Sequence, residues 1–373
     1  MSGPLAGFRI IEVGHMLAGP YCGMLLADLG AEVIKIETGE GDIARRMGPH
    51  YVGEHNVYFA SLNRNKLGVT LDLASDAGRA ALHALAAGAH GLITNLRPRA
   101  IKKLGLTYDH LKAFNPRLVC VALTGYGLEG PYAERPAYDY VIQAMTGIMR
   151  MTGDPGAEPT KAGYSAVDNA AGIMAALGLA AKLAEGKGGQ VDVAMYDVML
   201  SQLNYVAAAW LNAGELPQRY ARSAHPFIVP AQVFPTRDGW LMLFITHDDF
   251  WNSFCEEAGR QEWVRDARFA TLEGRRENRA LVIGELTDLL KNDTAANWVA
   301  RLVPRGIVAA AVDTLDNALA SDLAQSRDMV VALAGTEVRA VGNPIKTSGT
   351  EPEYGAPPRL GEHNARILGE CVK

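Results

Sequence analysis

Asp168 lies between a glycine-containing loop and a long run of helix-forming residues, where a carboxylate could take part in chemistry. Asp168 or Asn169 fits the N-cap position of the helix that follows. Free backbone N–H groups and the helix dipole favour the ionised form there, so we expect a charged carboxylate at neutral pH. The helix is rich in alanine and glycine and can approach another backbone closely. Capping and nucleophilic roles both remain open, and capping is the commoner use of such an aspartate.

Three other side chains could act near such a carboxylate. His15 lies in the turn after the first predicted strand, and Tyr138 and Asp139 open a helix after a Gly/Pro-rich loop. A turn histidine is often only structural, and a tyrosine beside an aspartate at a helix start can serve capping and packing. The residues alone leave both uses open. We find no Ser/His/Asp elbow, Walker loop or metal-ligand cluster in the sequence, so no metal site is expected.

A group of cations follows the fourth predicted strand, and its members are Arg97, Arg99, Lys102 and Lys103. Open α/β sheets bind ligands at the carboxyl ends of their strands. Cations placed there could meet phosphate groups. The alternative is a solvated basic face on surface helices.

The first predicted strand–turn–helix unit also invites a dinucleotide-binding hypothesis. Its turn contains Gly14 and Gly19, and Glu37 ends the second strand, where a ribose ligand would lie. The turn reads GHMLAGPYCG and lacks the three-glycine fingerprint. A nicotinamide-dependent oxidoreductase is therefore only a third hypothesis.

Alternating strands and helices must position these groups. Five apolar runs predict buried strands: Phe8–Val13, Ala31–Glu37, Leu67–Leu73, His90–Leu96 and Leu118–Thr124. Helices are predicted between them, at Tyr21–Leu29, Ser75–Ala87, Ala100–Leu104 and Tyr108–Phe114. The alternation indicates an α/β domain with a mainly parallel sheet. The Asp168 helix leads into a further strand, QVDVAM, and then a long helix at Tyr196–Leu211.

The sequence pattern changes after the predicted helix Tyr196–Leu211. The stretch Val233–Ile245 predicts a hairpin turning at Arg237-Asp238-Gly239, followed by helices at Asp248–Ala258, Arg275–Lys291 and Thr294–Leu302. Short β-like runs, an extended Pro/Gly-rich segment and a terminal helix near Gly361 complete the chain. We therefore expect a large α/β domain in residues 1–200, a linker in 201–228, a small α+β domain in 229–312, and a linker and return to the large domain in 313–373.

Composition narrows the class of protein. The chain has 373 residues, enough for two domains, and its 49% hydrophobic and 21% charged content is typical of a globular protein. A net charge of -5 argues against nucleic-acid binding. The scattered cysteines (Cys22, Cys120, Cys255 and Cys371) suit reduced thiols. We see no signal peptide, and the apolar stretch Ala170–Ala181 is too short for a membrane span. A cytoplasmic protein without a membrane partner is expected.

The motifs resemble those of the class III coenzyme A transferases. The similar segments run in the family's order along nearly the whole chain: residues 3–37, NLRPRAIKKLGL (95–106), GYGLEGPYAERPAYD (125–139), VDN around Asp168, HPFIVPAQVFPTRDG (225–239) and PRLGEHN (358–364). The resemblance implies interlocked dimers of ring-shaped chains. Each chain is expected to have a Rossmann-like large domain built from both chain ends, plus a small domain.

The resemblance also assigns site residues. Asp168 matches the family's catalytic aspartate, and Tyr138 and Asp139 fall beside the reacting acyl group. Positions that line the CoA site are matched by His15, Ala18, Leu71, Asn95, Leu96, Ala100 and Lys103. Together with the cation Arg97, these residues form the expected CoA-binding set. We expect no permanently bound cofactor, since coenzyme A enters as a thioester substrate.

Departures from the patterns of two branches of the family narrow the range of expected reactions. Formyl-transferring members carry glutamine at Leu17 and arginine at Thr38, and we find no counterpart of their glycine-rich flap near His225, so formyl-CoA and oxalyl-CoA are disfavoured. Racemases of the family carry histidine at Tyr138, and tyrosine is a poor base at neutral pH. We therefore predict a homodimeric CoA-transferase that moves CoA from an acyl-CoA to a carboxylic acid through an Asp168 anhydride and thioester. A 2-substituted acyl-CoA racemase is the alternative.

Overall fold

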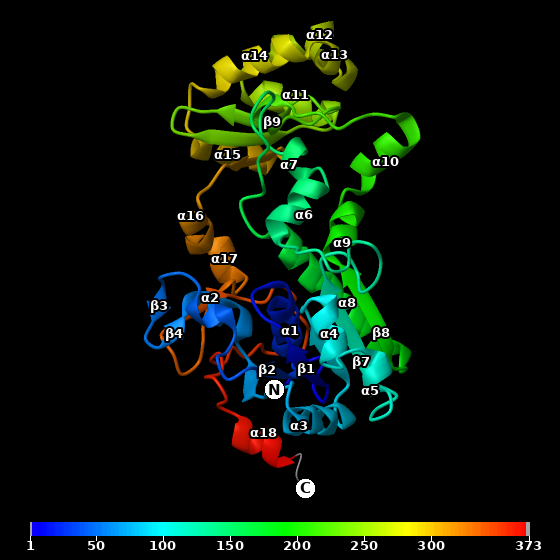
Figure 1. Cartoon of the computed structure of the whole chain (residues 1–373). Helices are drawn as coiled ribbons and strands as arrows, with labels where there is room; N and C mark the ends of the chain where they lie inside the picture. Colours follow the sequence, from blue (N-terminus) through cyan, green and yellow to red (C-terminus); the bar gives the residue numbers. More distant parts are fainter. Residues whose placement is uncertain (1, 371–373) are drawn as a thin grey trace. The chain divides into compact units, whose positions relative to one another are not determined.

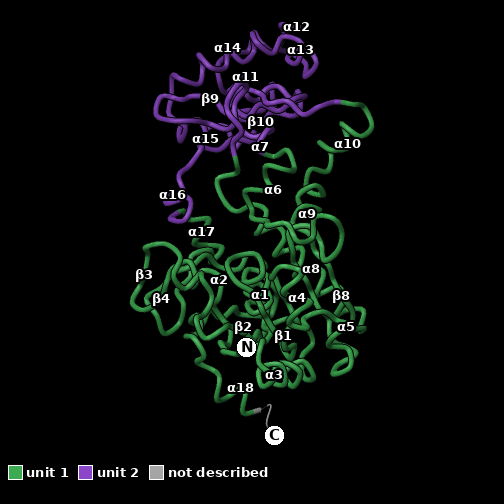
Figure 2. The backbone as a smooth tube through the Cα atoms, in the orientation of Figure 1, with its two compact units in different colours: residues 1–148, 161–214, 321–373 green, residues 149–160, 215–320 purple. Residues whose placement is uncertain are grey.

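The chain divides into two compact units. The structure, a computed structural model, describes residues 2–370, so the predicted thiol of Cys371 lies outside the described residues. The first unit contains residues 1–148, 161–214 and 321–373, and the second contains residues 149–160 and 215–320 (Figure 2). Both ends of the chain therefore belong to the same unit.

A six-stranded sheet forms the centre of the first unit, and each neighbouring pair of strands is parallel. Its order is β5-β2-β1-β6-β7-β8. The strands are β1 (Arg9–Val13), β2 (Glu32–Glu37), β5 (Lys66–Thr70), β6 (Gly91–Thr94), β7 (Val119–Thr124) and β8 (Gly189–Ala194). The prediction of an α/β domain with a parallel sheet is confirmed.

Helices cover both faces of this sheet because alternate residues of its buried strands point to opposite sides. Ile10 belongs to a core shared with α1 (Ala18–Asp28) and α8 (Ala166–Glu185). Ile11 belongs to the opposite core, together with residues of α3, α4, α5 and α18. These helices span Asp76–Ala87, Pro98–Lys103, Tyr108–Leu111 and Asn364–Glu370 (Figure 1). The two layers of helix bury the strands on both sides.

The helix that carries Asp168 packs closely on α1. A Cβ added at Gly172 would lie 2.8 Å from the carbonyl oxygen of Ala18, so only glycine allows this approach. By length and composition alone α8 is also apolar enough to cross a membrane. Its packing on α1 and on the sheet accounts for part of that apolar character, because Val167, Ala171 and Leu179 are buried in the core.

The structure corrects several predicted helix bounds. Helix α8 begins at Ala166 with Ser165 as N-cap, so the prediction of Asp168 or Asn169 at the N-cap is wrong. The helix predicted at Tyr196–Leu211 is two helices, α9 (Met195–Gln202) and α10 (Asn204–Ala213), because the backbone of Asn204 has a φ of 20°. The helix predicted at Arg275–Lys291 is likewise divided into α13 (Leu272–Glu277) and α14 (Arg279–Leu290).

Shorter elements complete the first unit. Sequence patterns did not predict the β3–β4 hairpin or α2, whereas α6 starts at Asp139 as expected. These elements are η1 (Ile43–Arg46), β3 (Tyr51–Val52), β4 (His55–Asn56), α2 (Val57–Asn63), α6 (Asp139–Met145), α17 (Asp322–Ser326), β12 (Val330–Ala332) and β13 (Arg339–Val341). Buried Arg64 ties the C-terminal segment to α1, since it donates to Asp28 Oδ2 (2.7 Å) and to the carbonyl of Val341 (2.8 Å).

The second unit is built on a small antiparallel sheet of order β11-β10-β9. The predicted hairpin is confirmed as β9 (Ala231–Pro235) and β10 (Trp240–Phe244), and β11 (Val308–Ala311) adds a strand that was not predicted. The helices of this unit include α11 (Asp248–Glu257), α12 (Ala267–Ala270), α13, α14, α15 (Ala295–Leu302) and α16 (Leu315–Ala320), with short turns η2 (Ala221–Ser223), η3 (Gln261–Val264) and η4 (Val303–Arg305). Helix α7 (Ile148–Met151) lies at the boundary between the units in sequence.

Candidate active site

A cavity of about 180 Å³ opens at the carboxyl ends of the parallel strands in the first unit. Its wall is formed by the turn between β1 and α1, the ends of β6 and β7, the segment before α6, and the first turn of α8. Its lining includes His15, Met16, Leu17, Ala18, Tyr58, Asn95, Leu96, Arg97, Arg135, Tyr138, Asp168 and Met195. This is the sheet edge where open α/β folds bind ligands.

Asp168 lies in the first turn of α8 and borders the cavity. The helix is capped by Asp139, a residue 29 positions earlier, whose Oδ1 accepts from the backbone N–H of Val167 (2.8 Å) and of Asp168 (3.4 Å). The N–H groups of Ala166 and Asn169 donate to the carbonyls of Tyr164 and Ser165. All four N–H groups of the first turn are therefore occupied, and our expectation that they would face the Asp168 carboxylate is wrong.

The electrostatic surroundings of Asp168 differ from those of an ordinary cap. Burial raises the pKa of its carboxyl group to about 7, and the negative charge of Asp139 adds to the shift. The prediction of a fully charged carboxylate at neutral pH is therefore corrected, because the N–H groups that would stabilise the anion are bonded to Asp139. Near neutral pH the group divides between its acid and its carboxylate form.

Asp139 is a positioning group and does not border the cavity. Its side chain is 4% exposed, and its Oδ2 accepts from Gln143 Nε2 at 2.6 Å. Gln143 in turn accepts from the N–H of Ala162 in the loop before α8. Both oxygens of Asp139 thus hold the start of α8, whereas the neighbouring Tyr138 is exposed and lines the cavity with Asp168.

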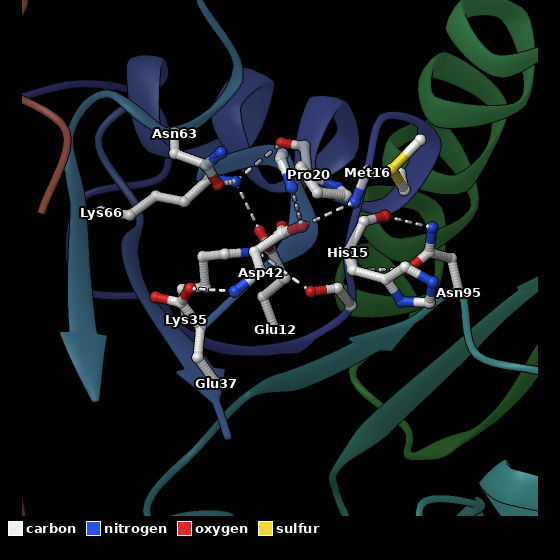
Figure 3. A network of polar contacts seen from close by, with 12 residues as sticks. Glu12, His15, Met16, Pro20, Lys35, Glu37, Asp42, Asn63, Lys66 and Asn95 are labelled. Atoms are coloured by element: carbon white, nitrogen blue, oxygen red, sulfur yellow. Dashed lines mark hydrogen bonds and ion pairs between the residues drawn. The ribbon is translucent and has the colours of Figure 1, made fainter. Parts of the chain in front are cut away.

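The predicted residue Asn95 has a structural task. Its Oδ1 accepts from the N–H of His15 at 3.0 Å, and its Nδ2 donates to the carbonyl of His15 at 2.9 Å (Figure 3). The next residue, Met16, has a φ of 66°, a left-handed conformation that costs a non-glycine residue about 1–3 kcal/mol. Although the His15 ring is exposed on the cavity wall, loss of nearby water lowers the pKa of its imidazole. The neutral ring is thus favoured at neutral pH.

A second cavity of about 460 Å³ adjoins the first, since His15 and Leu96 line both. It includes Leu71 and extends over the ends of β1 and β2 to Arg46. The predicted CoA residues therefore divide into groups. Ala18, Asn95, Leu96 and Arg97 line the first cavity and Leu71 the second, while Ala100 and Lys103 of α4 line neither.

Sequence reasoning missed polar residues of the first cavity, among them Tyr58 and Arg135. Tyr58 lies on α2, which no pattern predicted, and burial together with the charge of Asp168 raises the pKa of its phenol. Arg135 was within a motif already singled out, three residues before Tyr138, and its guanidinium lies 3.8 Å from the centre of the Tyr132 ring. The exposed cation near Asp168 is a feature that the motif could have indicated.

Comparison with known proteins places this geometry in a family. The model of CoA-transferase family III matches residues 5–364. The chain belongs to CoA-transferase family III. It is accordingly an acyl-CoA:carboxylate CoA-transferase, and the nicotinamide-dependent oxidoreductase is no longer a candidate.

Members of CoA-transferase family III resemble the chain over nearly its full length. The succinate–glutarate CoA-transferase of Agrobacterium fabrum is 35% identical over 386 residues, covering 98% of this chain and 95% of that protein. The acetyl-CoA:oxalate CoA-transferase of Acetobacter aceti is 34% identical, with 99% and 96% covered. The crystal structure of a CAIB/BAIF family protein from Brucella suis matches with a TM-score of 0.89 at 34% identity, covering 100% of both chains.

Proposed function

We propose that Asp168 is the nucleophile that carries CoA from an acyl-CoA donor to a carboxylic acid acceptor. One observation carries the proposal: Asp168 borders the cavity. The other carboxylate at the start of α8, that of Asp139, is buried and accepts hydrogen bonds through both oxygens. A carboxylate with a raised pKa is a stronger nucleophile once ionised, since nucleophilicity rises with basicity. The cavity wall keeps that carboxylate partly out of water.

The exchange balances without a metal or an added proton. The Asp168 carboxylate attacks the thioester carbonyl of the donor, which gives a mixed anhydride and releases CoA thiolate. The thiolate attacks the Asp168 carbonyl of the anhydride, which leaves an aspartyl-CoA thioester and frees the donor acid. The acceptor carboxylate then attacks the aspartyl-CoA thioester and again releases the thiolate. The thiolate finally attacks the acceptor carbonyl of the new anhydride, which gives the new acyl-CoA and restores Asp168.

The acyl-CoA is proposed to lie across both cavities, with its thioester beside Asp168 and its nucleotide end towards Leu71. His15 and Leu96 line both cavities and would contact the arm between these ends. Arg97 would supply positive charge at the first cavity. We propose Tyr138 as a hydroxyl donor to the reacting acyl group, because its exposed side chain lines the same wall as Asp168.

The proposed acceptor class is a small dicarboxylate. The names of two similar proteins, a succinate–glutarate and an acetyl-CoA:oxalate CoA-transferase, specify dicarboxylates as their substrates. In this chain Arg135 lines the Asp168 cavity, and a guanidinium binds a carboxylate well. One carboxylate of the acceptor would react while Arg135 holds the other. We further propose a cytoplasmic enzyme, since Cys22, Cys120 and Cys255 are free, buried thiols.

A homodimer is proposed from the apolar surface of the first unit. Helix α10 reads NYVAAAWLNA, yet none of its residues is buried, and Leu211 is 78% exposed. Apolar side chains of neighbouring elements are exposed as well, namely Ile173, Met174 and Leu177 of α8 and Leu200 of α9. A surface of this kind is typical of a contact with another chain. Light scattering on the purified protein tests this, and a monomer at micromolar concentration would contradict it.

The nucleophile is tested by trapping. Hydroxylamine added during turnover with succinyl-CoA and a panel of carboxylic acids is expected to convert Asp168 to its hydroxamate, read by peptide mass. A modified Asp139 with unmodified Asp168 would contradict the assignment. A parallel incubation of a chiral 2-methylacyl-CoA in deuterated water, without acceptor acid, is expected to show no catalytic exchange at the 2-position.

A further inference from the structure

Four buried charged side chains form a chain of alternating sign beneath the turn between β1 and α1. Lys66 of β5, Glu12 of β1 and Lys35 of β2 are each at most 3% exposed, and Asp42, in the segment after β2, is 4% exposed (Figure 3). We call these four residues the buried charge network. None of them lines the Asp168 cavity, and Asp42 alone of the four lines the adjoining second cavity.

The contacts run continuously through the network. Lys66 Nζ lies 2.7 Å from Glu12 Oε2, and Lys35 Nζ lies 2.9 Å from Glu12 Oε1. Lys35 Nζ also lies 3.0 Å from Asp42 Oδ2. Two carboxylates thus neutralise two ammonium groups, so the network has no excess charge to offer to a ligand.

The network ends on backbone atoms of the turn between β1 and α1 and of the start of α1. Lys35 donates to the carbonyl of Gly14 (3.0 Å), Asp42 Oδ1 accepts from the N–H of Met16 (3.1 Å), and Lys66 donates to the carbonyl of Pro20 (2.8 Å). Asn95 holds the N–H and the carbonyl of His15 between them. Polar side chains therefore fix the backbone from Gly14 to Met16 at four atoms, including the left-handed residue Met16.

Glycines make room for these side chains. A Cβ added at Gly23 of α1 would lie 2.0 Å from Glu12 Oε2, and one at Gly14 would lie 2.4 Å from Asn95 Oδ1. The backbone of the turn and helix thus closes directly over the polar groups that hold it. A small displacement of one hydrogen-bond acceptor would move the turn, because the packed atoms leave no free space around it.

We propose that Asp42 is a positioning residue for acyl-CoA binding, which acts by holding Met16 in its left-handed conformation and thereby His15 on the cavity wall. The inference rests on the proposed function of the cavity. Asp42 is suited to this task because one oxygen accepts from Met16 and from Ala44 (2.9 Å), while the other is fixed by Lys35. Its contribution to catalysis is the position of an acceptor and not its charge.

Two substitutions separate position from charge. Asp42→Asn keeps an acceptor at Oδ1 and removes the charge, whereas Asp42→Glu keeps the charge and moves the acceptor by one methylene. We expect Asp42→Glu to raise the KM for acyl-CoA about 10-fold with a smaller change in kcat, and Asp42→Asn to keep the KM within about 3-fold. Hydrogen exchange of the Gly14–Leu17 peptide should accelerate in Asp42→Glu and less in Asp42→Asn.

Asp28→Asn is the matched control. Asp28 is another buried carboxylate paired with a cation. It lies at the C-terminal end of α1, roughly 15 Å along the helix axis from the start of α1 at Ala18. We expect its substitution to lower the melting temperature without changing the KM. An equal rise of KM in Asp28→Asn, a rise in Asp42→Asn that exceeds the rise in Asp42→Glu, or unchanged KM values in both Asp42 variants would overturn the inference.

The proposed function is judged separately. Transfer by the wild-type enzyme tests that function, while the ratio between variants and the exchange data test the role of Asp42. Should the Asp42 variants fail to fold, the wild type still decides: the Met16 amide must exchange as slowly as the amides of β1. Exchange as fast as that of an exposed turn would overturn the inference.

Discussion

The turn between β1 and α1 and the first turn of α8 border the same cavity, and both have buried carboxylates nearby, but their charges are arranged in opposite ways. Beneath the turn between β1 and α1, the carboxylates of Glu12 and Asp42 lie 2.7–3.0 Å from the ammonium groups of Lys35 and Lys66. At α8, Asp139 and Asp168 carry the same sign, and Asp139 accepts only from neutral groups. Burial disfavours the charged form of the side chains in both regions. The charges of the neighbouring side chains decide whether this effect is compensated.

The pKa values express this difference. Burial alone would lower the pKa of Lys35, but the carboxylates of Glu12 and Asp42 raise it, so its charge is fixed. Burial lowers the pKa of Lys66 to about 8, since that ammonium group meets a single carboxylate. Asp168 has no such compensation, and its pKa rises to about 7. The charges of the buried network compensate one another, whereas the Asp168 carboxylate has a carboxylate of the same sign as its neighbour.

Removing the uncompensated carboxylate should have the largest effect. Asp168→Asn keeps the size of the side chain but provides no nucleophile, so we expect kcat to fall by about 10³-fold or more. Transfer measured by the mass of the new thioester checks this, with deamidation of the asparagine excluded by peptide mass. A variant that keeps a tenth of the wild-type activity would contradict the mechanism.

The same variant should be more stable than the wild type at high pH. The folded-state pKa of Asp168, about 7, lies above its ordinary value of 3.8, so the folded protein holds the proton more tightly. Its free energy of unfolding should therefore fall as pH rises from about 4 to about 7. At roughly 1.4 kcal/mol per pKa unit, and allowing for partial exposure, Asp168→Asn should gain about 2 kcal/mol near pH 8.

Denaturant unfolding of both proteins across this pH range measures the difference. The gain should vanish at about pH 3 and below, where the wild-type carboxyl group is mostly protonated in both the folded and the unfolded state. A constant difference across the range would show that Asp168 is not desolvated as described.

The cation on the cavity wall offers a smaller effect. Arg135→Gln should raise the KM for a dicarboxylate acceptor about 10-fold, because a charge-assisted contact is lost, and should change the KM for a monocarboxylate little. Steady-state assays with a matched pair of acceptors make the comparison. Exposed Arg117, which lies outside the Asp168 cavity, provides a control in Arg117→Gln. Equal effects on both acceptor classes would remove Arg135 from acceptor recognition.

Removing the negative charge of Asp139 should have the smallest effect, and it tests the contrast between the two regions directly. Asp139→Asn keeps an acceptor for the N–H groups of α8. It leaves the burial that mainly raises the pKa of Asp168 and removes the charge that adds to this shift. Activity should rise with pH through about 7 in the wild type, and this limb should move down by up to about one unit in the variant. The pH dependence of kcat/KM is the measurement. An unmoved limb would assign the shift to burial alone.

Much of the fold follows from local pattern. The strands around Ile10, Ile34 and Val121 are buried on both faces and are therefore continuous apolar runs, which the sequence shows directly. The helix break at Asn204 does not follow from local pattern, since the residues on either side of it are compatible with a helix. The short helix α2 does not follow either, and tertiary contacts decide both features. Sequence order alone also gave no reason to expect Lys66 beside Glu12.

Only part of the residue set of the candidate cavity could be predicted from the sequence, and its electrostatics could not. Asp168, His15 and Tyr138 were identified by resemblance to a family, and the structure brings all three to one cavity. The partner that caps α8 comes from 29 residues earlier, a contact that no helix-start pattern contains. Burial, with the negative charge of this long-range cap, raises the pKa of Asp168, the opposite direction from the one expected. The N–H groups that would have opposed the shift are bonded to Asp139.

The central claim is that the Asp168 carboxylate itself enters the exchange. In the proposed steps the acceptor carboxylate attacks the aspartyl-CoA thioester, and one of its oxygens remains on Asp168 when the thiolate takes the acceptor acyl group. Turnover with an acceptor labelled with heavy oxygen in its carboxylate should therefore place the label in Asp168, read by mass of the peptide that contains it. An unlabelled Asp168 after many turnovers would show that CoA moves without this carboxylate and would contradict the account.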